Sequence, residues 1–178
     1  MGTEELEPGK ALAELAALEA ATDELSETAG RLSDDDVRSS AERLHGTMRA
    51  MPAEAWEAGI RMLPEGPRVP AGRVPSRRLR EVLIHHVDLA ARYTPAHWPA
   101  AWVAGCLPEV AGDFARRDGV PAFTLRAEDT DRVIEVHGGG PTVTGPDAAL
   151  LTWLLGRSAG DGLTVTPHGP LPELPAWS

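Results

Sequence analysis

The side chains best suited to chemistry in this sequence lie between Arg80 and Leu89. Glu81 precedes His85 by four residues, and Asp88 follows His85 by three. On an α-helix these spacings place the three side chains on one face, with the carboxylate of Glu81 one turn from the imidazole. Carboxylate oxygen and neutral imidazole are ligands that zinc, iron, nickel and manganese accept. We therefore interpret Glu81 and His85 as part of a divalent-metal site.

The stripe formed by Glu81, His85 and Asp88 also has a simpler interpretation. Acidic side chains and histidines occur together on any solvent-exposed helix face. His86 falls on the opposite, apolar side of the helix and is expected to be a buried core histidine. Cys106 is expected to pack as a small hydrophobic side chain. Three further histidines fall in loops or at strand edges and are expected at the surface: His97, His137 and His168.

Composition limits the classes of partner. The chain has 178 residues, of which 42% are apolar and 25% charged, as in soluble globular proteins. Its formal net charge of −10 argues against a nucleic-acid partner, which needs a basic face. The single cysteine excludes an internal disulfide and fits a reducing compartment. Without a secretory signal or an apolar run of membrane-spanning length, the protein is expected in the cytoplasm and away from membranes.

The stripe requires a helix, and the periodicity of apolar residues predicts one from Ser76 to Tyr93. Two amphipathic helices are predicted before it, over 11–32 and from Ser33 to about Met51. A short helical turn is expected over 52–56. The Pro- and Gly-rich segment 59–75 is expected to connect these parts as a loop, with a short extended piece around 61–63.

The pattern changes after residue 95. A helix is predicted from Trp98 to about Arg117, kinked or split at Pro108. Alternating segments at 122–127 and 132–137 predict a hairpin, and further strands are expected at 141–144 and 163–166. A helix is predicted between them, from Pro146 to Gly156. Gly138 to Gly140 is interpreted as a turn rather than a phosphate loop. The predicted fold class is α+β, with a helical domain at 1–95 and a mixed domain at 96–178.

Several motifs, taken in order, resemble one known family. The segment Arg78 to Leu89 is similar to the signature of the mycothiol-dependent maleylpyruvate isomerases. Four later segments are similar to the same family: 124–127, 143–146, 150–157 and 162–165. The resemblance implies an incomplete DinB-like helical bundle followed by a small α/β domain like that of sterol carriers.

The resemblance also implies chemistry. Glu81 and His85 match the two metal ligands that the family supplies from this helix, with zinc the usual metal. Arg157 matches an arginine implicated in holding a dicarboxylate substrate, a task that suits a guanidinium. The implied cofactor is mycothiol, the thiol of actinobacteria, and the use of arginine with a single lysine, Lys10, fits a GC-rich genome.

The sequence departs from the family in one respect. Arg38-Ser39-Ser40 leads directly into what resembles the family's third helix, so the second helix and its metal-binding histidine are absent. His45 is the one histidine upstream of the loop. It is either a substitute ligand or, in the simpler interpretation, a residue of the helix surface.

Removing one helix of four is expected to expose an apolar groove, and a homodimer through the helical domain would cover it. Three hypotheses remain open. The chain is an isomerase or thiol transferase acting on a small unsaturated carboxylate, a non-catalytic family member that binds a partner, or a shortened product without activity. Metal content separates the first from the others, because ligand number sets affinity.

Overall fold

The computed structural model describes residues 8–29, 35–61, 65–89 and 92–177. The chain divides into two compact units, Met1–Arg92 and Tyr93–Ser178. The first is helical and the second combines helices with a sheet, so the predicted α+β class is confirmed. Among the described residues, no helix is both long and apolar enough to cross a membrane.

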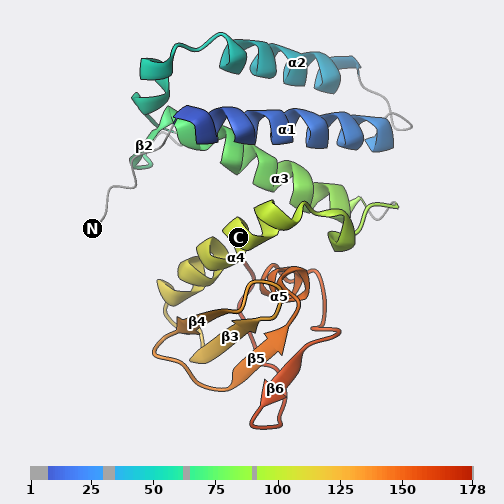
Figure 1. Ribbon diagram of the computed structural model, residues 1–178, viewed down its shortest axis with the longest axis vertical. Helices are drawn as coiled ribbons and strands as arrows, with labels where there is room; N and C mark the ends of the chain where they lie inside the picture. The colour runs from blue at the N-terminus through green and yellow to red at the C-terminus, as the bar shows by residue number, and fades with distance from the viewer. Residues whose placement is uncertain (1–7, 30–34, 62–64, 90–91, 178) are drawn as a thin grey trace. The chain divides into compact units, whose positions relative to one another are not determined.

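Three helices make up most of the described part of the first unit: α1 (Pro8–Ala29), α2 (Asp35–Arg49) and α3 (Val74–Asp88). In Figure 1, α1 lies between the other two and packs against both. Among its described side chains, the buried apolar ones, Leu15, Leu18 and Ala21, recur at spacings of three, as expected for a helix with one apolar face. The sequence also predicts Gly30 near the C-terminal cap of the first helix and Ser33 as the N-cap of the second, and both lie outside the described residues.

The buried face of α2 was predicted only in part. Hydrophobic periodicity places four residues on one stripe of this helix: Val37, Ala41, Leu44 and Met48. Among the described side chains, Met48 is buried as expected, at 3% exposed, but 36% of Leu44 is exposed and the adjacent His45 is buried, at 9%. The expectation that His45 lies on the helix surface is therefore wrong. Packing against α1 sets the rotation of α2, and a polar residue at a position facing α1 cannot be recognised from hydrophobic periodicity.

Short elements join α2 to α3. A 3-10 turn, η1 (Ala53–Glu57), occupies the predicted helical turn and buries Trp56. The predicted loop contains two antiparallel strands, β1 (Gly59–Arg61) and β2 (Arg68–Pro70), and a second 3-10 turn, η2 (Ala71–Arg73). Helix α3 begins directly after this turn with Pro75 in its first turn, where a missing N–H costs nothing.

The second unit is built on a four-stranded sheet in the order β4-β3-β5-β6. Its strands are β3 (Phe123–Ala127), β4 (Arg132–Val136), β5 (Thr142–Gly145) and β6 (Thr164–Thr166). The predicted hairpin pairs β3 with β4, and β3 also pairs with β5 in parallel. Alternate side chains of β3 are fully buried, so one face of the sheet forms a core.

Two helices pack on this sheet, α4 (Ala100–Ala115) and α5 (Asp147–Leu154). Leu107, Val110 and Phe114 of α4 are fully buried, and Phe123 meets Trp153 edge to face at 5.7 Å. A 3-10 turn, η3 (Pro95–His97), precedes α4. Cys106 is buried, as predicted.

Pro108 lies inside α4, which continues through it without splitting. Proline has no N–H, so the carbonyl of Ala104, four residues earlier, loses its partner within the helix. The guanidinium of Arg132 on β4 donates to that carbonyl at 2.5 Å. A side chain of the sheet thus replaces the hydrogen bond that proline removes.

The β3–β4 turn is tied to the start of α5 by a reciprocal pair of aspartates. The backbone N–H of Asp129 donates to the Asp147 carboxylate at 3.1 Å, and that of Asp147 donates to Asp129 at 2.8 Å. Thr130 adds a third hydrogen bond to Asp147, which is 3% exposed. After β4, Gly138 and Gly139 adopt positive φ in a tight turn, as predicted for this glycine run.

Candidate functional site

Helix α3 presents two faces, as its sequence indicates. Leu79, Val82, Leu83, Ile84 and His86 are buried on one side. His86 is 1% exposed, which confirms its prediction as a core histidine. Glu81, His85 and Asp88 are exposed together on the opposite side. The helix spacing that placed these three residues on one face in the sequence does so in the structure.

His85 lies between two carboxylates. Its Nδ1 is 3.0 Å from Oδ2 of Asp88, and its Nε2 is 3.3 Å from Oε2 of Glu81. A carboxylate only accepts, so the contact with Asp88 requires a proton on Nδ1. In the neutral imidazole, Nε2 then carries a lone pair that faces the carboxylate of Glu81. Attraction between these two atoms requires a cation between them, either a proton on Nε2 or a metal ion.

The distance between these two atoms suits a metal. Ligands bound to tetrahedral zinc at about 2.0–2.1 Å are about 3.3–3.4 Å apart. Nε2 of His85 and Oε2 of Glu81 are 3.3 Å apart. Asp88, on the other ring nitrogen, has the position of a carboxylate that orients a metal-binding histidine and fixes its tautomer. Glu81 and His85 therefore fit as a pair of ligands.

A third ligand is missing from the described part of the chain. No group of three or more His, Cys, Asp or Glu side chains arranged to hold a metal occurs among the residues described. His45 is buried on α2, whereas the side chains of Glu81 and His85 are 54% and 62% exposed on α3. Within this structure His45 does not complete the pair, which corrects the interpretation of His45 as a substitute ligand.

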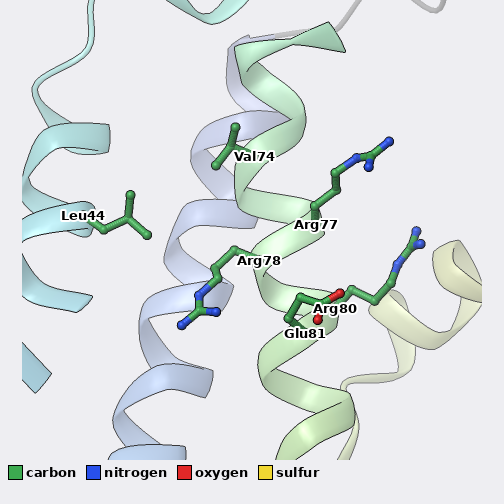
Figure 2. Close-up of a pocket in the computed structure, with 6 residues that line it drawn as sticks. All are labelled: Leu44, Val74, Arg77, Arg78, Arg80 and Glu81. Carbon is green, nitrogen blue, oxygen red and sulfur yellow. The ribbon is translucent and has the colours of Figure 1, made fainter. Parts of the chain in front are cut away.

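A pocket of about 300 Å³ adjoins Glu81 between α2 and α3. Figure 2 shows Arg78 extending from α3 on the side of α2, while Arg77 extends to the other side. The residues that line this pocket are Leu44, Val74, Arg77, Arg78, Arg80 and Glu81. Leu44 and Val74 are the apolar residues of this lining, and Arg77, Arg78 and Arg80 add arginine side chains to it. A pocket lined by both kinds of side chain suits an amphipathic occupant.

Arg157 belongs to the second unit, where it follows α5. Its backbone N–H donates to the carbonyl of Thr152 at 3.0 Å, and its Nη1 donates to the carbonyl of Leu155 at 2.6 Å. The half-buried guanidinium is thus held against the C-terminal end of the helix, whose partial negative charge favours a cation. The surface histidines behave as predicted: His97, His137 and His168 are exposed.

Comparisons with known proteins agree on one family. Residues 2–90 match the description "Mycothiol maleylpyruvate isomerase N-terminal domain", and residues 97–176 match "MDMPI C-terminal domain". A comparison with curated proteins finds no match.

Two solved structures are similar to this chain. One is a histidine-to-alanine mutant of the mycothiol-dependent maleylpyruvate isomerase, with 27% identity and a TM-score of 0.71 over 79% of this chain. This chain covers 58% of that protein's length. The other is a crystal structure of the mycothiol-dependent maleylpyruvate isomerase, with 22% identity and a TM-score of 0.65. The similarity covers 94% of this chain and 80% of that one, and it supports the fold. Because the two family matches together span nearly the whole sequence, the chain belongs to the mycothiol-dependent maleylpyruvate isomerase family.

Proposed function

We propose that this protein is a metal-assisted, mycothiol-dependent isomerase acting on a small unsaturated carboxylate. The observation that carries the proposal is the imidazole of His85, held by Asp88 on one side and 3.3 Å from Glu81 on the other. A metal-binding histidine needs one ring nitrogen held by a hydrogen bond and the other free to bind the metal, and His85 on α3 has this arrangement. The activity of the similar structures, maleylpyruvate isomerisation with mycothiol, is the specific candidate.

Glu81 and His85 would hold the metal, and zinc best suits one nitrogen and one oxygen ligand at tetrahedral spacing. A divalent metal, when bound, lowers the pKa of a coordinated thiol and so supplies a thiolate at neutral pH. Asp88 would keep Nδ1 of His85 protonated, which leaves Nε2 available as a ligand.

The reaction needs no redox partner. Mycothiol, when bound, would supply a thiol whose reversible addition to the cis double bond allows rotation to the trans form and returns the thiol unchanged. Arg157 is the residue proposed to anchor a substrate carboxylate through paired hydrogen bonds.

Assembly and location are further parts of the proposal. The pocket beside α3 and the 36% exposed Leu44 support a homodimer formed through the helical unit. The single cysteine, Cys106, which is buried, supports a reducing compartment such as the cytoplasm. Use of mycothiol would imply an actinobacterial source.

Elemental analysis combined with an isomerase assay tests the function. We expect the purified full chain to carry a transition metal, and to convert maleylpyruvate to its trans isomer only when mycothiol is added. Glu81→Gln and His85→Ala should each abolish metal binding and activity, since a pair that loses one ligand cannot hold the ion. Exposed His168 offers a matched control, and His168→Ala should change neither property.

Arg157→Lys separates substrate anchoring from metal binding. A lysine keeps the positive charge but cannot form the bidentate hydrogen bonds of a guanidinium with a carboxylate. KM for the carboxylate substrate should therefore rise about tenfold or more, while metal content stays the same. Metal below about half an equivalent, with no recovery on reconstitution, would reject the catalytic proposal, because ligand number sets affinity. It would favour the non-catalytic family member.

A further inference from the structure

The exposed residues of the α3 stripe are arranged symmetrically about the middle of the helix. Of the residues from Val74 to Leu89, six are exposed, and they lie at equal distances on either side of Leu83. The matching pairs, two, five and six residues from Leu83, are Glu81 and His85, Arg78 and Asp88, and Arg77 and Leu89. The basic residues lie toward the helix N-terminus, and Asp88 lies toward its C-terminus.

We propose that a second copy of this chain packs its α3 antiparallel against this stripe and completes the metal site with its own Glu81 and His85. A two-fold axis at Leu83 would bring each exposed position opposite its matching one. Arg78 would then face Asp88 of the partner subunit, and Glu81 would face the partner's His85. This pairing of Arg78 with Asp88 occurs on both sides of the axis, whereas a parallel arrangement would oppose like charges. The inference rests on the proposed metal binding by Glu81 and His85.

The ligand chemistry favours this completion. Each chain supplies one imidazole and one carboxylate with their donor atoms already 3.3 Å apart, and both side chains are more than half exposed. Two such pairs provide two nitrogens and two oxygens, the number that tetrahedral zinc takes. The two carboxylates balance the charge of one divalent ion. No described residue of the same chain offers a third ligand.

A shared site of this kind stays compatible with catalysis. Release of one Glu81 carboxylate would leave two imidazoles and one carboxylate, the protein ligands of several catalytic zinc sites that keep an open position. The resulting position is where a thiol would be accommodated. The two-fold axis therefore explains how a chain with two ligands reaches the ligand set that an active site needs.

The neighbouring pocket is continuous with the same stripe. Arg77, Arg78 and Glu81 belong to both, and Leu44 lies on the facing wall from α2. Leu44 and Leu89 are the large hydrophobic side chains exposed in the described part of the first unit, at 36% and 44%. A partner helix along the stripe would cover Leu89 directly and bring apolar surface toward Leu44.

Metal-dependent mass is the primary test. The full chain is freed of metal with a chelator, and its mass is measured by sedimentation at micromolar concentration with increasing Zn²⁺. We expect the 18.9 kDa chain to become a dimer, complete at one zinc per two chains. His85→Ala and Glu81→Gln should weaken zinc-dependent dimerisation by about 100-fold or more, because each removes two ligands from a shared site. The control His168→Ala should leave it unchanged.

Crosslinking tests the antiparallel direction. Two variants, Arg77→Cys and Leu89→Cys, are prepared separately and treated with a short bifunctional maleimide in the presence of Zn²⁺. We expect covalent dimers when the two variants are mixed, and few when either is treated alone. The unsubstituted chain is the control, because its one cysteine, Cys106, is buried.

The outcomes separate this inference from the proposed function. A monomer that binds one zinc through Glu81 and His85 and retains activity would overturn the shared site and leave the proposed function standing. A dimer that forms without zinc and is unaffected by His85→Ala would also overturn it. Failure to bind zinc in any state would overturn both. Crosslinking of each variant to itself would reject the antiparallel arrangement.

Discussion

At the scale of single residues, His85 is central to the proposed chemistry. Its two ring nitrogens have different partners, Asp88 at 3.0 Å and Glu81 at 3.3 Å. The distinction matters because a ligand nitrogen needs a lone pair, and a hydrogen bond from the other nitrogen determines where that lone pair lies. Asp88 is thus proposed to position His85 without itself binding the metal.

Removing Asp88 should weaken metal binding without destroying the fold. We expect Asp88→Ala to lower zinc affinity about 10- to 100-fold, the usual effect of losing a residue that orients a ligand. Competition with a chromogenic chelator measures it, and circular dichroism checks that the helix is retained. Exposed Glu57 in η1 provides a control carboxylate, so Glu57→Ala should keep the original affinity. Unchanged affinity in Asp88→Ala would mean that Asp88 has no part in the site.

At the scale of secondary-structure elements, one hydrogen bond between α4 and β4 gives a testable prediction. Pro108 deprives the carbonyl of Ala104 of its helical partner, and Arg132 supplies a substitute at 2.5 Å. Two elements far apart in the sequence therefore depend on one another through a single carbonyl. The proline is tolerated inside the helix because the sheet satisfies the carbonyl that it leaves.

A double-mutant cycle measures this dependence. Arg132→Ala should lower the free energy of unfolding by about 2 kcal/mol, since a half-buried acceptor loses a charged donor. Adding Pro108→Ala should recover most of that loss, because alanine restores the N–H that bonds Ala104 within the helix. Arg126, exposed on the paired strand, is the matched control, and Arg126→Ala should cost under about 0.5 kcal/mol. Chemical denaturation gives the values. Strict additivity of the two changes would contradict the proposed link.

At the scale of the whole molecule, the two units differ in how complete they are. The second unit buries a contiguous core between one face of its sheet and the helices α4 and α5. The described part of the first unit consists largely of three helices, with a pair of potential ligands and two large hydrophobic side chains exposed. The second unit thus has what an independently folding domain requires, whereas the first presents the features of an interface.

This contrast predicts different behaviour for the isolated units. A fragment of residues 93–178 should remain monomeric and unfold cooperatively, because its core is made by its own elements. A fragment of residues 1–92 should associate when zinc is added. Thermal unfolding followed by circular dichroism, with light scattering, measures both. A fragment 93–178 that lacks a cooperative transition would show that its core needs the first unit.

Local patterns predicted much of the fold. The hairpin of β3 and β4 followed from strict alternation on either side of a polar turn, and α3 from its two faces. The loop of 59–75 was predicted only in part, because its short strands pair with each other rather than with a larger sheet and carry little alternation. The buried face of α2 was predicted only in part: Met48 is buried as expected, but the burial of the neighbours Leu44 and His45 depends on where α1 packs.

The sequence by itself determined that Glu81, His85 and Asp88 share one helix face, because side chains three and four residues apart on a helix are neighbours whatever surrounds them. Tertiary structure alone decided which residues come together over long separations. It buried His45, joined Arg132 to Ala104, and paired Asp129 with Asp147. It also left Glu81 and His85 without a third ligand among the described residues. These outcomes depend on how elements pack against one another, which local spacing does not encode.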